Sequence, residues 1–126
     1  MPRVVALRKV PAELSEYWSP RIVGEVDDSY VKVAKVRGDL AWHKHEGEDE
    51  LFLVLRGHLR IEMEHESVEL KEGEMFIVPK GVCHNPVATE ECHILLFERK
   101  STAHTGDVVT EETRSIEDQL GRIAGE

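Results

Sequence analysis

Short runs of alternating polar and apolar residues, separated by Gly and Pro, recur between residues 21 and 100 and constrain the fold more than any other feature. In residues 58–65, Leu59, Ile61 and Met63 alternate with polar side chains, which is typical of a half-buried antiparallel strand. Comparable runs occupy residues 30–36, 50–55, 67–73, 74–79 and 91–100. At least six short strands with frequent turn residues predict an all-β sandwich or barrel.

Length and composition agree with one β domain. A chain of 126 residues matches the usual size of a single domain and can bury a sizeable core without disulfides. With 3 Phe, 2 Tyr and 2 Trp, the core must consist mainly of Val, Leu and Ile, which pack well on pleated sheets. We expect one domain over residues 1–126, with the barrel at about 22–100 and a C-terminal extension at 101–126.

Charge and hydropathy exclude several classes of partner. The net charge is −9, and no segment concentrates Lys and Arg as a nucleic-acid interface requires. The longest apolar runs, such as residues 51–55, are far shorter than the ~20 residues of a membrane span. The N-terminus lacks the apolar stretch of a signal peptide. We therefore expect a soluble, cytoplasmic protein without nucleic-acid or membrane partners, in which Cys83 and Cys92 remain reduced.

The run at residues 50–55 is apolar on both faces, so both faces must be covered. One candidate cover is the N-terminal segment, in which residues 11–18 could form one or two helical turns. The other candidate is a second subunit, and we expect a homodimer.

The C-terminal extension has little periodicity. Ile116, Leu120 and Ile123 are spaced by four and three residues, which would suit one face of a short helix. An acidic tail without regular structure is equally compatible with the composition. Both alternatives stay open.

A group of metal-binding residue types begins at His43. His43 and His45 are two residues apart, so in an extended strand both imidazoles point to the same side. Glu50 begins the next apolar run, where an unpaired carboxylate would be costly to bury. A bound cation would remove that cost, although a hydrogen-bonded pair of core histidines fits the same residues. The acidic residues between them fit a solvated loop.

The spacing of these residues resembles two conserved motifs of the cupin superfamily. The first reads Gly38-x4-His43-x-His45-x4-Glu50-x6-Gly57, and the second reads Gly73-x5-Pro79-x-Gly81-x2-His84. The first glycine is one residue closer to His43 than in the usual pattern, and Ala88 replaces an expected Asn. Neither departure affects a ligand position. The resemblance implies a small single-domain cupin with a double-stranded β-helix, or jelly-roll barrel.

The resemblance also implies a metal centre. The family's four ligands correspond to His43, His45, Glu50 and His84. This set suits one divalent transition metal, and Mn, Fe, Ni, Co, Cu and Zn are all compatible with it. A barrel without a functional metal remains the alternative.

Other polar residues are candidates for contacts with a small-molecule ligand. Lys32 shares its strand parity with Tyr30, and in similar small cupins the corresponding strand lines the pocket, so both are candidate substrate-binding residues. Cys92 and His93 lie on opposite faces of their strand, and one of them should face the interior. His104 is a candidate lid residue over the barrel mouth.

These features favour a metal-dependent enzyme, of isomerase or dioxygenase type, that acts on a small oxygenated metabolite such as a sugar or keto acid. A non-catalytic binding or sensing module is the alternative, because fold alone does not determine chemistry. An acid–base group near the metal, such as Lys32, Tyr30 or an inward His93, would favour the enzyme. A pocket of only aliphatic side chains would favour the binding module.

Overall fold

The computed structural model describes residues 3–121 and is built almost entirely of antiparallel strands. Its elements, in chain order, are the 3-10 helix η1 (Leu7–Glu13), β1 (Arg21–Val26), β2 (Ser29–Asp39), β3 (Glu50–Arg56), β4 (His58–Met63), β5 (Ser67–Lys71), β6 (Met75–Val78), β7 (His84–Arg99) and the helix α1 (Ile116–Gln119). The strands therefore lie between Arg21 and Arg99.

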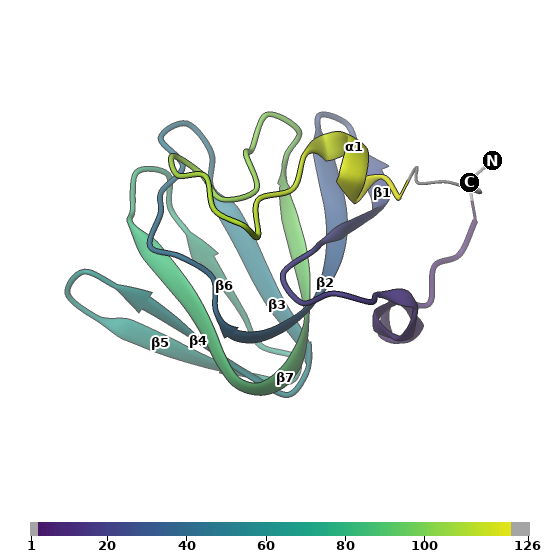
Figure 1. Cartoon of the computed structure of the whole chain (residues 1–126), viewed down its shortest axis with the longest axis horizontal. Helices are drawn as coiled ribbons and strands as arrows, with labels where there is room; N and C mark the ends of the chain where they lie inside the picture. Colours follow the sequence, from purple (N-terminus) through teal and green to yellow (C-terminus); the bar gives the residue numbers. More distant parts are fainter. Residues whose placement is uncertain (1–2, 122–126) are drawn as a thin grey trace.

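The long strand β7 organises the barrel (Figure 1). It pairs with β2 over most of its length, with β4 through its first residues and with β3 through its last residues. β1 and β6 extend the sheet at either end, and β5 pairs with β4. One strand that pairs with three others bends the sheet around a common interior, which is the predicted jelly-roll barrel of the cupin type.

The interior follows the period-two pattern of the strands. Val54 on β3, Ile94 on β7 and Ala34 on β2 are in register and all face inward. Leu59 and Ile61 extend this core along β4 and are completely buried. The barrel is therefore filled by aliphatic side chains, as its composition predicts.

The N-terminal segment covers part of the outer face of β3. Val10 of η1 packs with Val33 and Leu55 in a second, smaller apolar cluster. The helix lies earlier than the predicted 11–18, because the hydrogen bonds from Lys9 N to Ala6 O and from Leu14 N to Pro11 O define a 3-10 turn pattern. Pro11 is tolerated there although it lacks a backbone N–H.

The chain beyond β7 crosses the open end of the barrel and ends in α1 beside β1 (Figure 1). Ser115 caps α1 by accepting a hydrogen bond from Asp118 N at 3.1 Å. The helical alternative for the extension therefore holds at Ile116, whereas Ile123 lies outside the described residues. Within residues 3–121, no helix has the length and apolar character needed to span a bilayer.

Candidate metal centre

Four side chains from three parts of the chain converge inside the barrel, as predicted. His43 and His45 lie in the loop between β2 and β3, Glu50 begins β3, and His84 begins β7. The backbones of His43 and His84 form an isolated β-bridge, with N···O distances of 3.0 and 2.8 Å, which fixes the two imidazoles side by side. One ligand atom from each of the four residues lies within 4.8 Å of the other three, and all four residues are buried.

Backbone carbonyls orient two of the imidazoles. His43 Nδ1 lies 2.8 Å from Ala41 O, and His84 Nδ1 lies 3.0 Å from Val82 O. Because a carbonyl oxygen can only accept, each Nδ1 must carry the hydrogen. In the neutral imidazole the Nε2 atom then presents a lone pair, which is the arrangement that metal-binding histidines require.

The contacts of Glu50 indicate whether these four residues could bind a cation. Its Oε1 lies 3.3 Å from Nε2 of His45 and 3.3 Å from Nε2 of His84. His45 Nε2 is buried and has no hydrogen-bond partner within the described chain. A carboxylate oxygen facing the lone pair of His84 is repulsive unless a proton or a metal ion lies between them. The four residues therefore form a site that a divalent metal would satisfy.

The pKa values are consistent with deprotonated ligands. Burial, together with the nearby His84, lowers the pKa of His43 to about 4. Burial acts to raise the pKa of Glu50, but in the metal-free chain protons held between its carboxylate and the imidazoles of His45 and His84 outweigh burial and hold this pKa well below its usual range. Near neutral pH His43 is thus neutral and Glu50 is an anion, the forms that bind metals.

A buried ion pair lies next to the centre. Glu98 on β7 is in register with Glu50, and its Oε2 is 3.1 Å from Nζ of Lys32. Burial and the charge of Glu50 raise the pKa of Glu98 well above its usual range, although Lys32 acts in the opposite direction. The barrel therefore places a second carboxyl group, backed by a cation, beside the proposed metal ligand.

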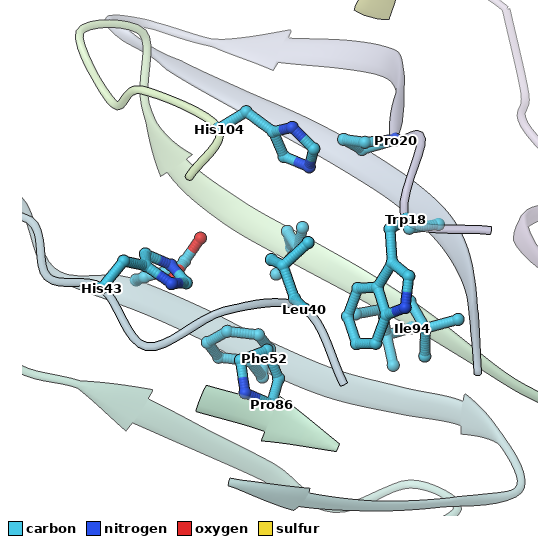
Figure 2. Close-up of a pocket in the computed structure, with 12 residues that line it drawn as sticks. Trp18, Pro20, Leu40, His43, Phe52, Pro86, Ile94 and His104 are labelled. Carbon is cyan, nitrogen blue, oxygen red and sulfur yellow. The ribbon is translucent and has the colours of Figure 1, made fainter. Parts of the chain in front are cut away.

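A narrow cavity opens onto the centre (Figure 2). His43 and Glu50 form its polar end, and the remaining walls come mainly from apolar side chains such as Trp18, Leu40 and Phe52. The cavity volume is about 30 Å³, which is room for a few water molecules. A larger ligand would enter only if part of the wall moved.

The other predicted ligand-binding residues occupy different positions. Lys32 is buried against Glu98, and Tyr30 is half-buried with its ring near the ammonium groups of Lys32 and Lys100. Neither Lys32 nor Tyr30 is among the described residues that line the cavity in Figure 2. Their role in substrate binding stays a prediction.

The face of the last strand and the position of His104 are also resolved. Cys92 points inward and is completely buried, whereas His93 points outward, where its Nε2 lies 2.8 Å from Glu91. Neither cysteine forms a disulfide within residues 3–121, and Cys83 is only half-buried. His104 does line the cavity, from the segment that crosses the barrel mouth.

Sequence reasoning missed two residues of this region. Glu98 has the same parity as Cys92, Ile94 and Leu96. A charged residue on an otherwise apolar strand face could have indicated that it belongs to the site. Trp18 had no comparable sign. It lines the cavity because its backbone adopts φ 59° and its indole Nε1 donates to Arg37 O at 2.8 Å, a conformation that no periodic pattern encodes.

Known proteins share this fold and parts of this sequence. Bacillus subtilis protein YdbB is 34% identical over 85 residues, which cover 67% of this chain and 75% of YdbB. The crystal structure of a cupin-2 domain containing protein from Shewanella frigidimarina has a TM-score of 0.75 at 38% identity and covers 77% of this chain and 95% of that one.

An enzyme is also among the relatives. The 3-hydroxyanthranilate 3,4-dioxygenase of Xenopus tropicalis is 32% identical over 104 residues, or 76% of this chain, but the aligned part is only 37% of the enzyme. The family model described as "Cupin domain" matches residues 29–98, from the start of β2 almost to the end of β7, and includes all four clustered residues. The chain belongs to the cupin family.

Proposed function

We propose that this protein is a metal-dependent enzyme of the dioxygenase type that acts on a small oxygenated metabolite, with ferrous iron as its ion. The observation that carries the proposal is the buried group of three imidazoles and one carboxylate, in which Nε2 of His84 lies 3.3 Å from Oε1 of Glu50. Imidazole and carboxylate ligands suit iron as well as the other divalent transition metals.

The relatives favour dioxygenase over isomerase chemistry. The Xenopus tropicalis protein is a dioxygenase by name, and the aligned region includes most of this chain. The chain spans little more than a third of that enzyme's length. The proposal is limited to a compound small enough for the barrel, with oxygen atoms that can reach the centre.

When bound, such an ion would polarise a coordinated oxygen of the substrate and, as iron, would support dioxygen chemistry. His43 and His84 would hold it with Nε2 atoms whose lone pairs are fixed by the backbone carbonyls of Ala41 and Val82. Glu50 would supply the negative charge. Phe52 and Trp18 would exclude water from the neighbouring cavity, which strengthens electrostatic interactions inside it.

The apolar walls favour a second candidate, a binding or sensing module without turnover. Side chains such as Phe52 and Leu40 can pack against a ligand but offer no group that reacts with it. His104 argues for the enzyme, because an ionisable side chain in the cavity is available to donate a hydrogen bond at the reacting group.

One experiment separates these functions. Untagged protein is purified without oxygen, its metal content is measured, and the iron-loaded form is tested in an oxygen electrode with catechols, aminophenols, keto acids and sugars. We expect about one ion per chain and oxygen uptake with one of these classes, both lost in His45→Ala. Conversion without oxygen uptake would indicate an isomerase, tight binding without conversion would indicate a binding module, and absence of bound metal would refute the metal centre.

A further inference from the structure

His104 reaches the cavity from outside the cupin motifs. It belongs to the segment 101–115, here called the C-terminal strap, which links β7 to α1 and crosses the barrel mouth. Thr102 and Thr105 of the strap are almost completely buried. The strap is therefore packed onto the barrel and is not a loose tail.

Gly106 and Asp107 fix the strap against the loop that carries the first two histidines. Lys44 N donates to Asp107 Oδ1 at 3.1 Å, and Asp107 N donates to Lys44 O at 3.2 Å. Gly106 has φ 58°, and a Cβ there would collide with Lys44 O and approach His43 Cδ2 to 2.9 Å. Only glycine allows the strap to approach the metal centre this closely.

The strap also sets the tautomer of His104. The backbone N–H of Arg114 donates to His104 Nδ1 at 2.8 Å. Because a backbone N–H can only donate, Nδ1 must hold the lone pair, and in the neutral ring the hydrogen is on Nε2. This tautomer is opposite to that of His43 and His84, whose Nδ1 atoms donate to carbonyls. His43 and His84 therefore present Nε2 lone pairs in their neutral forms, whereas His104 presents an Nε2–H donor.

The donor is directed at the cavity. Figure 2 shows the His104 ring extending over the pocket, opposite Phe52 and Pro86. The other lining side chains with an N–H, Trp18 and His43, already donate to Arg37 O and Ala41 O. Within residues 3–121 no hydrogen bond involves His104 Nε2, so this N–H is available to a ligand in the cavity.

We propose that His104 Nε2–H donates a hydrogen bond to an oxygen of the ligand held at the metal centre, and so selects compounds with two neighbouring oxygens, such as a keto acid or an enediol. One oxygen would face the metal and the other would face His104. This inference rests on the proposed metal-dependent function and adds to it a residue that determines ligand class. A hydrocarbon or a lone-pair-free group at the second position would cover this donor and leave it unsatisfied.

The test uses the full chain loaded with Co²⁺ and titrated with oxalate, a dianion with paired oxygens, while the visible absorption of cobalt is recorded. In His104→Leu we expect unchanged cobalt content and oxalate binding weaker by about 10-fold or more, the usual effect of losing a hydrogen bond to a charged group. His104→Gln, which keeps an N–H donor near the same position, should retain affinity within about 3-fold. His93→Leu, on the outer face, is the matched control.

The outcomes are distinct. Equal oxalate affinity in wild type and His104→Leu, at equal cobalt content, would overturn the inference and leave the metal centre intact. Failure of the wild type to bind cobalt would overturn the proposed function and this inference with it. If His104→Leu does not fold, nitrogen NMR of the metal-free wild type decides the tautomer: hydrogen on Nε2 of His104 supports the inference, and hydrogen on Nδ1 refutes it.

Discussion

Lys32 Nζ and Glu98 Oε2 form an ion pair of 3.1 Å in which both side chains are at most 2% exposed. The two residues are diagonal neighbours on paired strands, since Lys32 is in register with Leu96, two residues before Glu98. Both groups of a buried ion pair have lost their hydration, so removal of one leaves the other without compensation. Because Glu98 is also in register with Glu50, the pair supports the position of a proposed metal ligand.

Breaking this pair should destabilise the protein strongly. Lys32→Met leaves Glu98 buried without its cation, and we expect a loss of about 3 kcal/mol in the free energy of unfolding, measured by urea denaturation of the metal-free protein. The double variant Lys32→Met/Glu98→Gln should lose clearly less than the sum of the single variants. Lys100→Met, which removes an exposed pair with Glu25, should cost under about 1 kcal/mol. Additive single effects would show that the pair is not coupled.

Metal retention should depend on His45. Its Nε2 is buried and makes no hydrogen bond within residues 3–121, so this atom is available to an ion. We expect His45→Ala to lose most of the bound metal after desalting, as measured by elemental analysis. His58→Ala, on the exposed face of β4, should keep it. Full retention of the ion in His45→Ala would contradict the assignment of His45 as a ligand.

The barrel and the four clustered residues were predictable from the sequence because both depend on spacing. Period-two runs determine which residues face inward, and the motif that begins at His43 determines which of them meet. The position of η1 was not predictable, because a short 3-10 helix has no periodic pattern and Val10 packs against Val33 and Leu55, which are distant in sequence. The strap was not predictable either, since its place depends on contacts of Gly106 and Asp107 with Lys44 that are distant in sequence.

A homodimer stays a prediction, and the structure suggests where to test it. η1 covers the outer face of β3 near Leu55, whereas Met75 and Ile77 on the neighbouring edge strand β6 are 57% and 45% exposed. A second copy on this face would bury them. We expect light scattering at micromolar concentration to give twice the chain mass for the wild type and the chain mass for Ile77→Asp. Val109→Asp, at an exposed site on the strap, should remain dimeric. A monomeric wild type would refute the prediction.

Acid should destabilise the metal-free wild type relative to His104→Gln. Burial and the charge of Lys32 lower the pKa of His104 in the folded protein to about 4, from 6.5. Between these two values the unfolded chain binds a proton at this residue and the folded chain does not, so the free energy of unfolding falls as the pH falls. The contribution of His104 to the free energy of unfolding is fully present above pH 6.5 and decreases by about 1.4 kcal/mol per pH unit down to about pH 4.

The glutamine variant has no group at position 104 that binds a proton in this range. Other groups, including Glu98, titrate in both proteins, so the difference between the two urea-unfolding free energies isolates His104. We expect the free energy of unfolding of the wild type minus that of the variant to keep its pH 8 value down to about pH 6.5. Below pH 6.5 this difference should decrease steadily, because only the wild type loses stability through His104. A difference that is constant from pH 8 to pH 5 would show that His104 is not buried as a neutral donor at the barrel mouth.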